Sequence, residues 1–204
     1  MKTFGGIEEI HASFENARVL LQSIPYDGTS TWGKGADKGF EAFLDAAENM
    51  ELYDIETDSE VYRQGIHLLP EIDEDRSPEK VFEKIYSTTK ELIKTNKFLT
   101  FFGGEHAISI GIIKAFYEAY PGLTVLQLDA HADLRPEYLG TPYNHACAVY
   151  DASLNTNLVQ VGIRSMDSSE NQYLDRAKCF FAQDIRNATE WMKRSIDMMG
   201  QKVY

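Results

Sequence analysis

The chain has 204 residues, of which 43% are hydrophobic and 25% are charged, and this composition excludes a disordered or fibrous protein. Its formal net charge of -12 at pH 7 argues against nucleic-acid binding, which needs basic surface, and suits a cationic substrate or a metal ion. No run of about 18 apolar residues occurs, so we expect no membrane-spanning helix and no membrane partner.

Apolar runs of strand length alternate with segments of helical spacing. In chain order the pattern predicts a strand at 17–24, a helix at 37–49, a strand at 51–55, a helix at 78–95, a strand at 98–102, a helix at 107–120, strands at 123–128, 158–162 and 179–182, a helix at 185–199 and the start of a strand at 201–204. Continuous apolar strands separated by helices predict a parallel sheet covered on both faces. We therefore expect one α/β domain over residues 1–204.

The N-terminal segment and the cysteines point to a reducing compartment. The first residues place acids and His11 where a secretion signal needs an apolar stretch, so we expect a cytoplasmic protein. Cys147 and Cys179 form no CxxC pair and are predicted to be reduced thiols.

Ligand-type side chains gather where two predicted strands end, which is where α/β sheets place their sites. Gly103-Gly104-Glu105-His106 permits a tight turn that puts His106 in the first turn of a helix, where it either binds a ligand or caps the helix. Asp129-Ala130-His131-Ala132-Asp133 follows an apolar strand, and alternation along a strand predicts that Asp129, His131 and Asp133 project to one side.

Two carboxylates this close to each other and to an imidazole form an unfavourable cluster, because their like charges repel and raise their pKa values. A divalent cation bound between them removes this cost. Carboxylate and imidazole without thiolate favour manganese, iron or zinc, and the spacing leaves open whether one or two ions bind. His145 lies in a loop-like stretch shortly after this cluster. It is either a proton shuttle for the site or a histidine of a surface loop. His11 and His67 lack such a context and are expected to be structural.

These motifs, in this order, resemble the ureohydrolase family of arginases, agmatinases and formimidoylglutamases. The resemblance is carried by the GGEH of 103–106, the DAHAD of 129–133, the NHA of 144–146, the PYDGTST loop of 25–31 and the VGIR of 161–164. It implies a three-layer αβα sandwich around a parallel sheet, commonly assembled as a trimeric or hexameric homo-oligomer.

The resemblance also implies a binuclear Mn²⁺ site. His106, Asp129 and Asp133 would ligate one ion and His131 the other, with Asp129 bridging the two. Metal-activated hydroxide would attack the guanidinium carbon, and His145 would pass a proton to the leaving amine. Asp129 and His145 are therefore the predicted catalytic residues.

The substrate is expected to be a small cationic guanidino compound. Arginase-like members carry an asparagine after the DAHxD segment that binds an α-carboxylate, whereas this chain reads Leu134-Arg135-Pro136. The resemblance is therefore closest to agmatinase, which hydrolyses agmatine to putrescine and urea in polyamine metabolism. Relatives acting on aminopropylagmatine, arginine or formimidoylglutamate are the alternatives.

The family's third signature, SxDxDxxDP, does not occur in the chain, and it should follow Val203-Tyr204. We therefore expect a fold truncated at its C-terminus, in which four ligands remain. Two further hypotheses follow: an inactive fragment that binds at most one metal or serves as an interaction module, and a deacetylase-like amide hydrolase on a related fold.

Overall fold

The computed structural model describes residues 2–204, and the contacts among them divide into two units, residues 2–75 with 91–105 and residues 76–90 with 106–204. Each unit holds a three-stranded sheet in which all strand pairs are parallel. Parallel strands with flanking helices confirm the predicted α/β class. The expectation of one domain over the whole chain stays a prediction. Among the described residues, no helix is both long and apolar enough to span a membrane.

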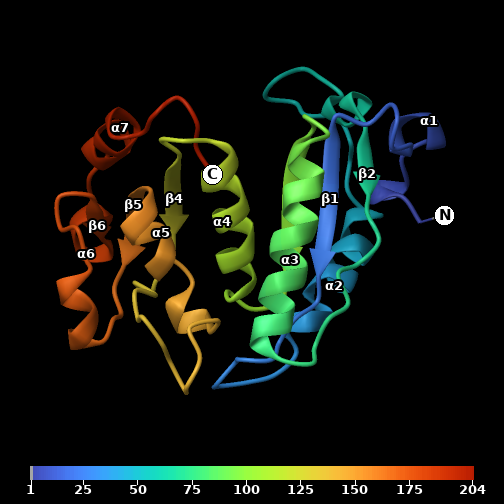
Figure 1. Cartoon of the computed structure of the whole chain (residues 1–204). Coiled ribbons are helices and arrows are strands. Elements are labelled where there is room, and N and C mark those ends of the chain that lie inside the picture. Colours follow the sequence, from blue (N-terminus) through green and yellow to red (C-terminus); the bar gives the residue numbers. More distant parts are fainter. Residues whose placement is uncertain (1) are drawn as a thin grey trace. The chain divides into compact units, whose positions relative to one another are not determined.

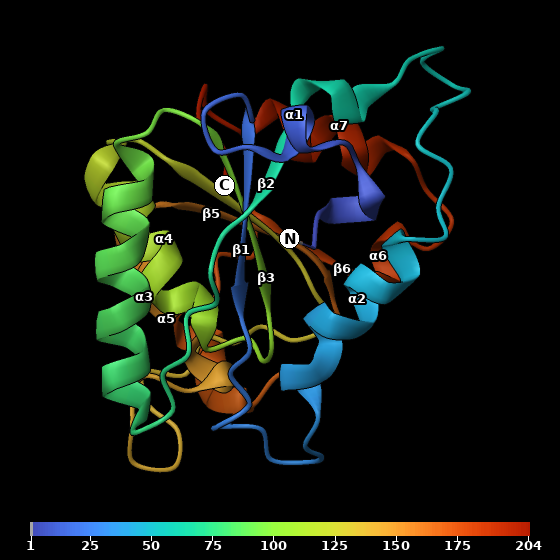
Figure 2. The same ribbon diagram turned by 90° about the vertical axis from the view of Figure 1, so that its right-hand side faces the viewer.

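The first unit orders its strands β2-β1-β3. Its elements are the 3₁₀ helix η1 (Phe4–Gly6), α1 (Glu9–Ala12), β1 (Val19–Ile24), η2 (Ala36–Lys38), α2 (Gly39–Ala47), η3 (Val61–Gln64), β2 (Ile66–Leu68) and β3 (Phe98–Gly103). β1 pairs with β2 on one side and with β3 on the other, and Figure 2 shows these strands crossing in projection with α2 beside them. Phe40 and Phe43 of α2 pack on Phe102 of β3, with the Phe43 and Phe102 ring centroids 4.7 Å apart.

The second unit orders its strands β4-β5-β6. Its elements are most of α3 (Pro78–Ile93), α4 (Ile108–Ala119), β4 (Thr124–Leu128), the 3₁₀ helix η4 (His145–Cys147), α5 (Tyr150–Asn155), β5 (Asn157–Ile163), η5 (Ser168–Gln172), β6 (Cys179–Phe181), α6 (Ala182–Ile185) and α7 (Glu190–Asp197). Figure 1 shows α4 on one side of these strands and α6 and α7 on the other.

Alternate residues of the second sheet enter two different apolar clusters. Val125 belongs to the cluster with Ile113 of α4, whereas the neighbouring Leu126 packs against the cluster of Val159, Val161 and Phe180, which Trp191 of α7 also covers. Because side chains of a strand alternate between its faces, both faces of this sheet are covered. The second unit is therefore a three-layer αβα arrangement.

Two predicted elements need correction, and one strand was not predicted. Residues 51–55 form no strand, because the Asp54 carboxylate accepts the amides of Glu56 and Thr57 in a local turn that competes with a sheet ladder. The strand β2 was not predicted because it has only three residues and lies at a sheet edge. The predicted helix at 185–199 is shorter, because α7 covers only Glu190–Asp197. Residues 186–189, where Asn187 and Thr189 disfavour a helix interior, separate it from the short α6.

The predicted start of a strand at 201–204 is present as a parallel bridge. Val203 pairs with Thr124 of β4. The Tyr204 amide donates to the Thr124 carbonyl at 2.9 Å, and the Leu126 amide donates to the Tyr204 carbonyl at 2.9 Å. These residues therefore add to the β4 edge of the second sheet.

Candidate metal centre

Three of the predicted ligands lie together in the second unit. His106 stands two residues before α4, Asp129 directly follows β4, and Asp133 ends the same loop. One ligand atom from each of His106, Asp129 and Asp133 lies within 4.8 Å of the other two. The carboxyl end of β4 therefore collects two carboxylates and the imidazole of His106, whereas His131, which the sequence grouped with the two carboxylates, lies outside this set.

The three side chains lie close enough to share one ion, although His106 and Asp133 are also hydrogen-bonded to each other. His106 Nδ1 lies 2.7 Å from Asp133 Oδ2 and 3.4 Å from Asp129 Oδ2. Two ligand atoms held 2.1 Å from one ion at a right angle are about 3.0 Å apart. All three side chains are partly or largely buried, so their charges are poorly screened by water. The donor set and its spacing fit a hard or borderline divalent cation.

Asp129 turns its two oxygens toward two different histidines. Its Oδ2 faces His106, while its Oδ1 lies 3.4 Å from His131 Nδ1 and also accepts the His131 amide at 2.8 Å. The His131 side chain is 63% exposed. The arrangement places one carboxylate between two imidazoles.

The ligand loop departs from extended strand geometry at Asp133. Asp129 still donates its amide to Val161 of β5, but Asp133 has a φ of 51°, a left-handed conformation that aspartate tolerates better than most residues. The alternation argument therefore fails at Asp133, whereas His131 still pairs with Ser165 in a parallel bridge. Asp133 meets His106 because the backbone bends, and its own carbonyl accepts the Val149 amide at 3.2 Å.

Glu170 is a buried acid of this region that the sequence reading missed. It is 3% exposed; its Oε1 accepts the Leu134 amide at 3.1 Å and its Oε2 accepts the Asp167 amide at 2.8 Å. It thereby ties the residue after Asp133 to the N-terminus of η5. The only sequence signal was the DxxE spacing of Asp167 and Glu170, which is that of a capping box.

His145 lies in η4, outside the group formed by His106, Asp129 and Asp133. The side chain of the buried Asn144 accepts the Ala146 amide at 3.1 Å and begins this short helix. The His145 ring meets the Tyr138 ring edge-on, with centroids 6.1 Å apart. The proton-shuttle role of His145 stays a prediction.

In the first unit, the loop after β1 is held by two carboxylates. Glu105 Oε1 accepts the Thr29 hydroxyl at 2.7 Å and the Thr29 amide at 3.3 Å. Burial opposes ionisation of Asp27, but hydrogen bonds from Ser30 and Gly35 and the nearby Lys34 outweigh it and lower the pKa of Asp27. The glutamate of GGEH therefore has a structural partner in the PYDGTST loop.

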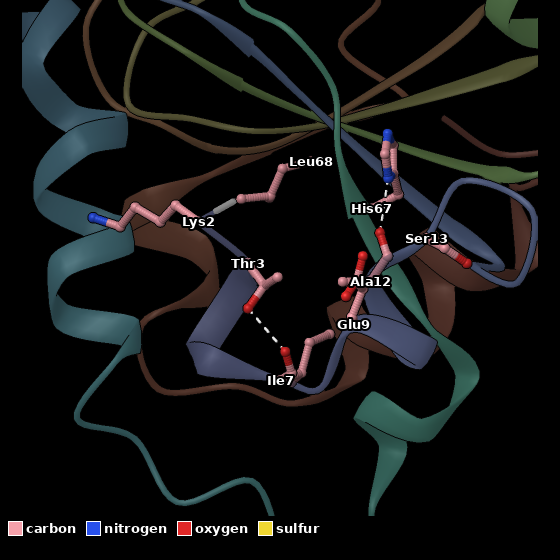
Figure 3. Close-up of a pocket in the computed structure, with 8 residues that line it drawn as sticks. All are labelled: Lys2, Thr3, Ile7, Glu9, Ala12, Ser13, His67 and Leu68. Atoms are coloured by element: carbon pink, nitrogen blue, oxygen red, sulfur yellow. Dashed lines mark hydrogen bonds between the residues drawn. The ribbon is translucent and has the colours of Figure 1, made fainter.

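A cavity of ≈ 350 Å³ also lies in the first unit (Figure 3). Its lining residues are Lys2, Thr3, Ile7, Glu9, Ala12, Ser13, His67 and Leu68. His67 Nδ1 is bonded to the Ala12 carbonyl at 2.8 Å, which ties β2 to α1 and supports the structural role expected of this histidine. The Lys2 ammonium and the Ser13 hydroxyl point away from the cavity, so its polar groups do not converge on a ligand.

Comparison with known proteins identifies relatives of most of the chain. The Arginase family profile matches residues 17–204. The N(1)-aminopropylagmatine ureohydrolase of Synechocystis sp. is 28% identical over 96% of this chain, which spans 68% of that relative's length.

Two solved structures share the fold. The agmatine ureohydrolase of Thermoplasma volcanium superposes with a TM-score of 0.83 at 25% identity, covering 100% of this chain and 70% of that one. A formiminoglutamase of Trypanosoma cruzi, solved with manganese, superposes with a TM-score of 0.79 at 19% identity, covering 95% of this chain and 71% of the other. The architecture described above is thus that of arginase-like proteins.

Proposed function

Because the chain belongs to the arginase family, we propose that it forms the metal-binding part of a ureohydrolase that releases urea from agmatine. The observation that carries this proposal is the placing of Asp129 between His106 and His131, with one oxygen toward each imidazole. A carboxylate in that position suits a bridge between two ions. The relatives named above support hydrolysis of a guanidino carbon–nitrogen bond.

In this proposal His106, Asp129 and Asp133 would hold one Mn²⁺, and His131 with Asp129 would hold a second. When bound, such ions lower the pKa of water and supply a nucleophile at neutral pH. The carboxylates and imidazoles are the ligand types that suit manganese, and the absence of thiolate from the described group disfavours a cysteine-type zinc site.

The remaining chemistry falls to side chains of this chain. Histidine exchanges protons near neutral pH, so His145 can deliver a proton to the departing amine. The formal charge of -12 draws a cationic guanidinium toward the protein. A cytoplasmic location and a homo-oligomeric assembly belong to the same proposal.

Agmatine is favoured over arginine by the environment of Arg135. This residue follows the ligand loop at the place where an arginase-like member would recognise an α-carboxylate. Its Nη2 lies 3.5 Å from Asp167 Oδ2, and its guanidinium stacks over the Tyr138 ring at 4.6 Å. Arg135 is therefore engaged by this chain's own groups. Aminopropylagmatine, the substrate named for the Synechocystis relative, also lacks an α-carboxylate and is the second candidate.

Manganese-dependent urea release tests the proposal. Protein with the mass of this 204-residue chain is assayed with agmatine, aminopropylagmatine and arginine, and the number of bound Mn²⁺ ions is measured in parallel. We expect urea from the first two substrates. Asp129→Ala should abolish it because the variant lacks the bridging carboxylate, whereas Glu137→Ala, which changes an exposed acid, should not.

Urea release by Asp129→Ala at the rate of the unchanged chain would contradict the site assignment. Binding of a single ion without urea release would support the alternative of an inactive fragment. A His145→Ala variant should turn over more slowly with its manganese content unchanged. Loss of manganese from that variant would instead make His145 a ligand.

A further inference from the structure

Two glutamines interrupt the apolar strands that lead to the ligand loop. Gln127 lies in β4 (TVLQL) and Gln160 in β5 (NLVQVGI), and the two are direct partners in the parallel register. Gln127 is 6% exposed and Gln160 3% exposed. A buried primary amide lowers stability unless its donors and acceptor are bonded. Their partners therefore show what these residues do.

The glutamines form a chain of hydrogen bonds that ends on the ligand loop. Gln160 Nε2 donates to Gln127 Oε1 at 2.7 Å and to the Ala132 carbonyl at 2.9 Å. Gln127 Nε2 donates to the His131 carbonyl at 3.2 Å. The carbonyls of His131 and Ala132, which lie between Asp129 and Asp133 in the sequence, thus accept hydrogen bonds from side chains of β4 and β5.

The carbonyl of Ala132 in particular needs such a partner. Ala132 is fully buried, and a buried carbonyl without a hydrogen bond is strongly unfavourable. The amide of the same residue is bonded to the Ser165 carbonyl at 3.2 Å, on the chain that leaves β5. The backbone at Ala132 is therefore fixed on both its donor and its acceptor side. A rotation of the peptide after His131 or Ala132 would break a bond to a glutamine and move Asp133.

We propose that Gln127 and Gln160 are positioning residues for the metal centre, a role that rests on the proposed function of the chain. By holding the carbonyls of His131 and Ala132, they fix the backbone that carries Asp129 and Asp133. The carboxylates then stay at the separations from His106 that one ion requires. Groups that orient metal ligands commonly change metal affinity 10- to 100-fold when they are removed, and a group that acts through the backbone belongs at the low end of this range.

The test compares manganese affinity in chains that differ at one buried glutamine. Gln160→Met keeps an unbranched side chain of similar size but has no amide to donate. Free Mn²⁺ is measured by electron paramagnetic resonance during titration of the 204-residue protein, and absorption of bound Co²⁺ reports the ligand geometry. We expect Gln160→Met to bind Mn²⁺ about tenfold more weakly and to alter the Co²⁺ spectrum. Gln127→Met should have a smaller effect because the bond from Gln160 to Ala132 remains.

Gln22 supplies the matched control. It lies in β1 of the first unit, is 3% exposed, and its Nε2 donates to the carbonyls of Ser23 at 2.9 Å and Pro70 at 2.8 Å. Gln22→Met therefore removes the same kind of buried amide from two backbone carbonyls elsewhere. It should lower the midpoint of urea unfolding about as much as Gln160→Met does, while manganese affinity stays within twofold of the unchanged chain, since Gln22 holds no part of the ligand loop.

Weaker Mn²⁺ binding in Gln160→Met but not in Gln22→Met would support the positioning role. Equal Mn²⁺ affinity in Gln160→Met and the unchanged chain would overturn it and leave the proposed function standing. No Mn²⁺ binding by the unchanged chain would overturn the proposed function and the positioning role together. If Gln160→Met does not fold, Gln127→Met decides: unchanged affinity there contradicts the role, and weakened affinity supports it.

Discussion

Replacing Glu170 with alanine removes a buried carboxylate that accepts two backbone hydrogen bonds. The Leu134 amide is buried and would lose its partner, which costs about 2 kcal/mol, and the partly buried Asp167 amide adds about 1 kcal/mol. We therefore expect Glu170→Ala to lower the free energy of unfolding by about 3 kcal/mol. For a chain of this size the midpoint of thermal unfolding should fall by about 6 to 12 °C.

Urea unfolding followed by circular dichroism measures this loss. Glu137→Ala, an exposed acid of the same region, is the control and should change the free energy of unfolding by less than about 0.5 kcal/mol. Glu170→Gln keeps one acceptor oxygen, so we expect an intermediate loss. A difference of less than about 1 kcal/mol between Glu170→Ala and the control would refute the reasoning, because it would mean that water or another group satisfies both amides.

The other predictions concern buried thiols and one glycine. Burial raises the pKa of the Cys147 and Cys179 thiols to about 11. Both thiols should therefore react slowly with a thiol reagent at pH 8 until urea unfolds the chain. Fast labelling of the native chain would contradict their burial. Because these pKa values exceed that of an unfolded cysteine, the thiols stabilise the fold below about pH 9, and stability should fall as the pH rises toward 11, measured as the urea midpoint. A Cβ at Gly104 would lie 1.9 Å from the Tyr26 carbonyl oxygen, whereas a Cβ at Gly33 would meet nothing within 4 Å. Gly104→Ala should therefore unfold at a much lower urea concentration than Gly33→Ala. Equal midpoints of urea unfolding would refute the close approach at Gly104.

The local patterns of the chain were sufficient for much of the fold and for the composition of the site. Strands β1, β3, β4 and β5 and helix α4 follow from apolar runs and from the turn residues between them, since burial selects such runs whatever they pack against. His106, Asp129 and Asp133 could be identified from the sequence as candidate metal ligands, because acids and imidazoles beside a buried strand need a compensating charge.

The tertiary structure alone decided how those ligands are held. The Glu170 bond to Leu134 spans 36 residues, and the bond between Gln160 and Gln127 spans 33. Such pairs depend on the register of β4 with β5 and on the left-handed turn at Asp133, and neither is a property of neighbouring residues in the sequence. The sequence by itself thus determined which groups could bind a metal, whereas the packing of distant segments decided their separations, because a hydrogen bond between distant residues forms only once the fold has brought them together.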